Sequence, residues 1–151
     1  MSAGTPMANY AAARRAGDFV LLSGVVAVDP ARRVVLSRYE ELEEPAREAL
    51  RGLGYDTGQM SVDLFEAPIV AQSWFVLNRI RQLAEEQGGC MNDAVKLVQY
   101  FRDLRHYPAF NRVRGIFYPT EPPVSTVVEV SRFLPGDDAL VEVEATLYMP
   151  R

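Results

Sequence analysis

Two glutamates near the carboxyl end of the chain have the spacing of a pair that can handle protons. Glu142 and Glu144 lie in the segment VEVEA, in which charged and apolar residues alternate. Because strand side chains point alternately to the two faces of a sheet, both carboxylates fall on one face and the valines on the other. A carboxylate on a rigid strand can give and take a proton in a cleft. The same pattern is also typical of a plain solvated face.

A second candidate group stands near the amino end. The apolar run FVLLSG ends on Ser23 and Gly24. A glycine there lets a ligand approach main-chain donors that a Cβ would obstruct, although a bulge or bend explains it equally well. Tyr10, which precedes Ser23, could close a cleft and offer its hydroxyl to a substrate. Alternatively, its ring could anchor the first strand to the core.

Other chemically active residues are few. His106 is the only histidine and has no nucleophile elbow beside it, so we expect a loop or cap residue. Cys90 is the only cysteine, which excludes an intrachain disulfide or a Cys/His zinc cluster within one subunit and fits a reducing cytoplasm. We expect its thiol to be buried or half-buried and inert, with a catalytic thiolate as the alternative. The GxxxxGK, GxGxxG and HExxH motifs are absent.

The composition predicts one domain over residues 1–151. Of these 151 residues, 48% are hydrophobic, which is enough for one core. The 16 basic and 20 acidic residues give a net charge of −4, and no Lys/Arg run can follow a phosphate backbone, so nucleic acid is an unexpected partner. No apolar stretch approaches the roughly 20 residues of a membrane span, so we expect a protein with no membrane partner, located in the cytoplasm.

The candidate residues must be positioned by strands and helices that the pattern predicts in a ββαβαββ order. A hairpin is expected from Tyr10–Arg15 and Phe19–Val28, followed by a charged excursion over Ala31–Met60, or to about residue 66, with one short helix that stops at Gly52 or Gly54. The three-and-four spacing over Ala67–Gln87 indicates the main helix, with Trp74 in its core stripe.

The second half of the chain supplies a strand, a helix and two more strands. Ala94–Leu104 indicates a central strand, buried on much of both faces. A helix begins near Pro108, buries Phe110 and Phe117, and stops before Pro119. The last strands are Ser125–Arg132 and Ala139–Met149. Right-handed crossovers place both helices on one face of a mixed sheet, and the bare face is expected to meet further copies of the chain.

These motifs together resemble the Rid family, also called YjgF. The resemblance rests on Tyr10 with Ser23-Gly24, MNDAVKLVQYFRDL after Gly88-Gly89, the Phe110-Asn111 helix, PPVSTVVEV, and the closing EVEA. It implies an α+β, chorismate-mutase-like fold packed as a trimeric barrel, with small-molecule substrates bound in intersubunit clefts. Many members hydrolyse enamines or imines to keto acids and ammonia with no metal and no organic cofactor.

The resemblance also implies roles for individual residues. Glu142 matches the family's functional carboxylate, and Tyr10, Ser23, Gly24 and Asn111 fall among substrate contacts. Ser125 stands where active deaminases commonly carry an arginine that pairs with the substrate carboxylate, while Thr126 and the Val127 backbone follow it on the strand. Loss of that charged pair should cost about 2 to 3 kcal/mol, or roughly a hundredfold in affinity.

A replacement cation could come from elsewhere. Arg14, Arg112 and Arg114 are candidates, with Arg114 favoured, although each could be a plain surface residue. Alternatively, the substrate is larger, such as an aminomuconate-like compound, and depends less on one carboxylate. A non-catalytic small-molecule-binding trimer is the rival function, and the charge balance disfavours a ribonuclease.

Overall fold

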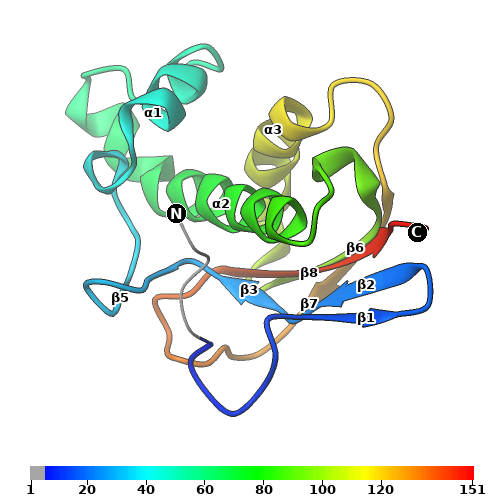
Figure 1. Ribbon diagram of the computed structural model, residues 1–151. Helices are drawn as coiled ribbons and strands as arrows, with labels where there is room; N and C mark the ends of the chain where they lie inside the picture. Colours follow the sequence, from blue (N-terminus) through cyan, green and yellow to red (C-terminus); the bar gives the residue numbers. More distant parts are fainter. Residues whose placement is uncertain (1–5) are drawn as a thin grey trace.

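The computed structural model describes residues 6–151 as one mixed sheet with helices packed on it (Figure 1). The strands are β1 (Ala13–Ala16), β2 (Phe19–Leu22), β3 (Val25–Val26), β4 (Val28–Asp29), β5 (Val34–Val35), β6 (Ala94–Phe101), β7 (Val124–Glu129) and β8 (Val141–Tyr148). The α-helices are α1 (Glu44–Arg51), α2 (Met60–Glu86) and α3 (Tyr107–Phe117), with short 3-10 turns at Tyr39–Glu41, Met91–Asp93 and Leu104–His106.

The main sheet has the order β1-β2-β8-β6-β7, with β3 also paired to β8. Neighbouring strands run antiparallel except β6 and β7, which are parallel and are connected through α3. Without the short added elements β3, β4, β5 and α1, the chain follows the expected ββαβαββ order. The last strand, β8, therefore lies in the middle of the sheet, and β7 forms one edge.

The first hairpin contains a bulge at a residue that matters below. Val20 pairs with Leu147 on β8, whereas Val25 pairs with Val143, so β2–β3 carries one residue more than β8 between these two points. An extra residue of this kind is a β-bulge, which bends the strand and redirects the side chains opposite it. The bulge falls at Ser23-Gly24, as the alternative interpretation of the glycine predicted.

The helices α2 and α3 lie side by side over one face of the sheet (Figure 1). Leu77 and Ile80 of α2 and Phe110 of α3 are fully buried against the sheet. The ring of Trp74 lies 4.9 Å from the ring of Phe117, so these residues join the two helices, as the core-stripe interpretation predicted. Helix α2 contains Pro68, which cannot donate the backbone hydrogen bond of a helical residue. Its stability therefore comes mainly from this packing.

Several expected boundaries differ from the structure. The excursion is structured: it contains β5, which pairs with β4, and α1, which ends at Arg51 directly before Gly52. Helix α2 begins already at Met60 instead of Ala67, and β7 ends at Glu129 instead of Arg132. β6 ends at Phe101, and Leu104 belongs to a 3-10 turn. β6 is central, but the expectation of burial on both faces is wrong: the strand is buried mainly on the face toward the helices, and Lys96 on the opposite face is exposed. Because that opposite face carries both apolar and polar residues, the alternation of buried and exposed positions is not visible in the sequence.

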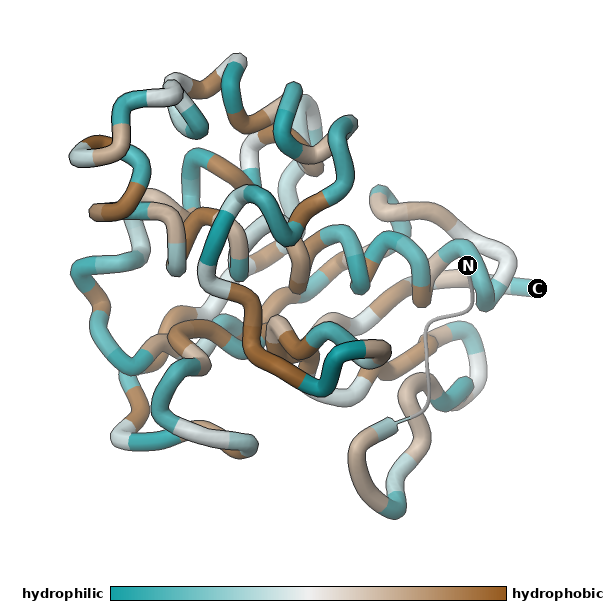
Figure 2. The backbone as a smooth tube through the Cα atoms, turned by 90° about the vertical axis from the view of Figure 1, so that its left-hand side faces the viewer, coloured by the Kyte–Doolittle hydropathy of each residue, from teal (hydrophilic) through white to brown (hydrophobic). Residues whose placement is uncertain are grey.

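The sheet face opposite the helices carries exposed hydrophobic side chains. Leu21 and Phe19 on β2, Tyr148 on β8, and Val124 and Val128 on β7 are between 38% and 67% exposed. Hydrophobic and hydrophilic residues alternate along the chain instead of separating into two halves of the molecule (Figure 2). The described part of the chain contains no helix that is long and apolar enough to cross a membrane.

Candidate functional site

Glu142 and Gly24 meet at the bulge. Glu142 is on β8 opposite Val26, and its carboxylate lies over the backbone of Gly24. A Cβ added to Gly24 would come within 2.1 Å of Glu142 Oε1 and 3.0 Å of its Cδ. Only a residue without a side chain allows this approach. The bulge and the close approach therefore describe the same arrangement, and the two explanations of Gly24 are not exclusive.

The environment of Glu142 favours its protonated form. Its side chain is half-buried, and burial raises the pKa of this carboxyl above its ordinary value, with the negative charge of Glu144 acting in the same direction. No hydrogen bond reaches the carboxylate from the described part of the chain. A carboxyl group with a raised pKa holds a proton more readily than an ordinary carboxylate and can return it, which is the requirement for a general acid–base residue.

Glu144 lies on the same face of β8, as the alternation predicted, but in a different environment. The hydroxyl of Tyr100 on β6 donates a hydrogen bond of 2.6 Å to Glu144 Oε1. This bond raises the pKa of Tyr100, and it holds the Glu144 carboxylate in place. Of the two glutamates, Glu142 is therefore the one whose carboxylate is available to a ligand.

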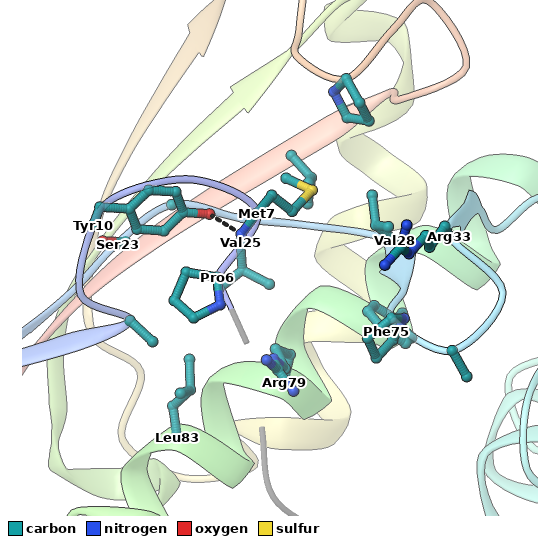
Figure 3. Close-up of a pocket in the computed structure, with 16 residues that line it drawn as sticks. Pro6, Met7, Tyr10, Ser23, Val25, Val28, Arg33, Phe75, Arg79 and Leu83 are labelled. Atoms are coloured by element: carbon teal, nitrogen blue, oxygen red, sulfur yellow. Dashed lines mark hydrogen bonds between the residues drawn. The ribbon is translucent and has the colours of Figure 1, made fainter. Parts of the chain in front are cut away.

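Gly24 and Ser23 also line a cavity with a volume of about 930 Å³ (Figure 3). Ser23 donates its hydroxyl proton to the Ala11 carbonyl at 2.6 Å, so only its oxygen lone pairs remain for a ligand. Tyr10 lines the same cavity and is 43% exposed, which argues against the alternative that its ring anchors a strand to the core.

The other predicted contacts gather around Arg114 of α3. The guanidinium donates hydrogen bonds to Ser125 Oγ at 3.1 Å, to Asn111 Oδ1 at 2.7 Å and to the Tyr107 hydroxyl at 2.8 Å, and a further one to Gln99 Oε1. It also lies over the rings of Tyr107 and Phe110. A positive charge thus stands directly beside Ser125. Within residues 6–151, every hydrogen-bond partner of Arg114 is neutral and no carboxylate pairs with it.

Gln99 is a member of this cluster that the sequence did not reveal. It is fully buried on β6, and its Nε2 donates to Ser125 Oγ at 2.8 Å and to the Thr126 carbonyl at 3.0 Å, while its Oε1 accepts from Arg114. A buried amide must satisfy both its donor and its acceptor groups, which fixes the orientation of its neighbours. The available signal was a glutamine at a core-facing position of an otherwise apolar strand.

The two groups lie on opposite faces of the sheet. Ser125 pairs with Leu97, which pairs with Ala145, and these positions face the helices. Glu142 pairs with Tyr100, whose neighbour on β7 is Val128, and these positions face the other way. One subunit therefore brings Glu142, Gly24, Ser23 and Tyr10 together, and separately Arg114, Asn111 and Ser125, but it does not join the two groups.

Thr126 and Val127 belong to the edge strand. Thr126 pairs with Val98, which pairs with Glu144, so the Thr126 side chain lies on the same face as Glu142, and it is exposed. Val127 is half-buried against the core. In the described part of the sheet, β7 is paired only with β6, so one edge of its backbone is open to a further partner.

The remaining candidates lie elsewhere. Arg14 is exposed on β1, and Arg112 contacts Glu66 at 3.6 Å and lies over the Tyr55 ring, so neither stands beside Ser125. His106 is half-buried in the turn before α3. Cys90 is exposed, which corrects the expectation of a buried or half-buried thiol: it lies in the short link between α2 and β6 and is not covered by either element.

Comparison with known proteins gives one family. The family model described as Endoribonuclease L-PSP matches residues 49–149. A RutC family protein of Pyrococcus abyssi is 28% identical over 143 residues, which cover 95% of this chain and 88% of the relative. The 3-aminoacrylate deaminase RutC of Acinetobacter baylyi is 25% identical over 144 residues, covering 95% of this chain and 90% of the relative.

Solved structures agree with the sequence relatives. The structure of a candidate endoribonuclease from Klebsiella pneumoniae is 50% identical to this chain and superimposes on it with a TM-score of 0.87. The match covers 93% of this chain and 100% of the Klebsiella chain. RidA from an Antarctic Psychrobacter is 23% identical with a TM-score of 0.72 over 98% of this chain and 94% of that one, which shows the same fold. These neighbours share the mixed α+β architecture of one sheet with helices.

Proposed function

The chain belongs to the Endoribonuclease L-PSP family, also called Rid or YjgF, and from this premise we propose that it is a cytoplasmic deaminase that hydrolyses an enamine or imine without a cofactor. Relatives named 3-aminoacrylate deaminase and RidA support a deaminase role at the level of the family. The reaction class asks for a proton shuttle, a site for water, and donors that orient the polar end of the substrate.

Glu142 is the proton shuttle in this proposal. The protonated Glu142 carboxyl first gives its proton to the enamine carbon, which leaves an iminium ion and the Glu142 carboxylate. Water then adds to the iminium carbon and gives one proton to this carboxylate, which passes it to the nitrogen. The C–N bond breaks as the carboxylate takes the hydroxyl proton of the intermediate, so the products are a carbonyl compound and ammonia, and Glu142 is protonated again. The observation that carries the proposal is the half-buried Glu142 carboxyl, whose pKa is raised by burial, held against Gly24.

Arg114 supplies the positive charge that the strand lacks at Ser125. Its hydrogen bonds to Ser125 at 3.1 Å and to Asn111 at 2.7 Å lie at the surface, whereas that to Gln99 is part-buried. A substrate carboxylate displaces the two exposed neutral partners, because a charge-assisted bond to a guanidinium is about twice as strong as a neutral one. Ser125, Asn111 and the backbone of Thr126 and Val127 at the open edge of β7 then orient the same end of the substrate.

A homotrimer joins the two groups of residues. Glu142 and Arg114 lie on opposite faces of one subunit's sheet, so a small substrate that contacts both needs the second group from another copy. The exposed face with Leu21, Tyr148 and Val124, and the open edge of β7, are surfaces on which such copies can pack. The intersubunit cleft and the trimeric, chorismate-mutase-like barrel are part of the proposal.

A non-catalytic small-molecule binder with the same assembly is the rival function. The observation that favours it is the saturation of Arg114 by four neutral acceptors. A guanidinium with four N–H groups already used is a poorer fork for a carboxylate than a strand arginine with free donors.

Ammonia release decides between the two functions. Purified protein is mixed with freshly generated 2-aminoacrylate or 2-iminobutanoate, and separately with 2-aminomuconate, and ammonia is measured against the uncatalysed reaction. The proposal expects turnover of at least one compound, with the larger one preferred if Arg114 replaces the strand arginine imperfectly. No turnover of any of the three, together with a ligand that stays bound through purification, would favour the binder.

A further inference from the structure

The cavity next to Gly24 is positively charged. It lies between the N-terminal segment, the strands β3 and β4 with the turn that follows them, and helix α2. The residues that line it include Tyr10, Ser23, Phe75, Arg33 and Arg79. Both charged residues in the described lining are arginines, and no aspartate or glutamate is among them. In a chain with a net charge of −4, a cavity lined by two cations and no anion selects for an anionic ligand.

Arg33 is held at the cavity by a rigid turn. Asp29 caps the turn between β4 and β5: its carboxylate accepts hydrogen bonds from the backbone N–H groups of Ala31 at 2.9 Å and Arg32 at 3.2 Å, and its carbonyl accepts from Arg33 at 2.7 Å. Arg33 itself has a φ of +58°, a region that favours Gly or Asn. An arginine in this conformation is unusual, and backbone strain of this kind concentrates at functional positions.

Arg79 approaches the cavity from α2. Its side chain is half-buried, and burial lowers the pKa of its guanidinium, while Glu86 acts in the opposite direction. Arginine nevertheless stays protonated in proteins, so Arg79 contributes a positive charge to the cavity lining. Phe75, one helical turn before Arg79 on the same side of α2, adds an apolar surface to the cavity.

The cavity has two different ends. In the close-up view, Tyr10 and Ser23 lie at one end, Val28 and Arg33 at the other, and Arg79 between them on α2 (Figure 3). Gly24 lies with Ser23 at the first end and is also the residue against which the Glu142 carboxylate packs. Arg33 is thus separated from Gly24 by a stretch that is lined by valines, Phe75 and Arg79.

We infer that the substrate is an extended acid with an anionic group remote from its reacting carbon, and that Arg33 and Arg79 bind this remote group while the reacting end lies at Gly24. The assignment of the reacting end rests on the proposed role of Glu142. The volume of about 930 Å³ is within the range of about 300–1,000 Å³ for sites that accept drug-sized molecules and far exceeds the needs of a three- or four-carbon imino acid. The cavity therefore specifies the class of substrate: a dicarboxylate-type enamine or imine.

Stable keto acids test this inference without turnover. Calorimetric titration compares 2-oxoglutarate, 2-oxoadipate and 2-oxopimelate with 2-oxopentanoate, 2-oxohexanoate and 2-oxoheptanoate, which match them in chain length and lack only the remote carboxylate. The unsubstituted protein should bind at least one dicarboxylate about tenfold more tightly than its partner compound. Arg33→Asn, which tolerates the positive φ, and Arg79→Gln should each reduce this preference several-fold, and the double variant should abolish it.

Two further variants act as controls. Arg79→Lys keeps the charge and should keep most of the preference, even if Arg79→Gln folds poorly. Arg132→Gln removes an exposed arginine outside the cavity lining and should leave the preference unchanged. Equal affinity of all matched pairs, no measurable binding of either member, or a preference that survives in the double variant would overturn the inference. An arginine-dependent preference in a protein that releases no ammonia from any imine would refute the proposed function and leave this inference standing.

Discussion

Replacement of Gly24 by alanine separates the chemistry of the site from the stability of the fold. The new Cβ would lie 2.1 Å from Glu142 Oε1, whereas ordinary contacts begin at 3.4 Å, so the carboxylate must move by about 1.3 Å. The obstructing atom is the far end of a flexible side chain, and the backbone of Gly24 is not in the left-handed region, so the fold can accept the methyl group. A displacement of about 1 Å in a catalytic group costs roughly a hundredfold in rate.

The expected result is therefore a loss of about a hundredfold in kcat for ammonia release, with little change in Tm. The methyl group should gain about 0.4–1 kcal/mol by restricting the unfolded chain, which offsets part of the local crowding and keeps Tm within about 4 °C of the unsubstituted protein. Gly115→Ala is the matched control, because a Cβ there meets nothing within 4 Å and stabilises α3. Full activity of a well-folded Gly24→Ala protein would refute the reasoning.

Three other predictions follow from the same contacts. Glu142→Gln should raise Tm at neutral pH. The pKa of Glu142 is higher in the folded than in the unfolded chain, so the protonated carboxyl stabilises the fold at low pH, and this contribution is lost as the pH rises. Thermal melts should show the difference in Tm shrinking toward pH 4.5, and a difference that grows on acidification would contradict the prediction. Gln99→Leu should lower the free energy of unfolding by about 1–3 kcal/mol in urea titrations, because it removes the buried acceptor of Arg114 and the donor to Ser125. Gln99→Glu should retain the contact with Arg114 as an ion pair. Ser125→Arg alone should be destabilising, because it places a second guanidinium beside Arg114. The double variant Ser125→Arg with Arg114→Ser should restore stability and lower the KM for 2-aminoacrylate about tenfold or more. Equal behaviour of the single and double variants in thermal melts and kinetics would contradict the position of Arg114.

The local arrangement of the site could be predicted from the sequence where it depends on residues close together in the chain. The alternation in VEVEA placed Glu142 and Glu144 on one face, and the glycine after an apolar run indicated either a bulge or a close approach, both of which occur at Gly24. Arg114 is the favoured one of the three candidate arginines, and the structure places it beside Ser125.

Features that depend on strand pairing could not be predicted in this way. Whether Ser125 and Glu142 share a face depends on the register of β7 and β8 against β6, and the sequence does not state this register. The same holds for Gln99, whose partners come from two other elements, and for Arg33, which enters the cavity only because the β4–β5 hairpin folds back. The strands β4 and β5 have only two residues each, which is too short for a recognisable alternation of side chains.

The most direct test of the account compares two glutamates on the same strand face. Glu142→Gln and Glu144→Gln are isosteric changes of neighbouring positions, but only the Glu144 carboxylate is held by the Tyr100 hydroxyl, at 2.6 Å. Single-turnover ammonia release from the preferred imine should fall by about 10²–10⁴-fold in Glu142→Gln, the usual contribution of a general acid–base residue, and by less than about tenfold in Glu144→Gln. Equal losses in the two variants, or unchanged turnover in Glu142→Gln, would contradict the assignment of Glu142 as the proton shuttle.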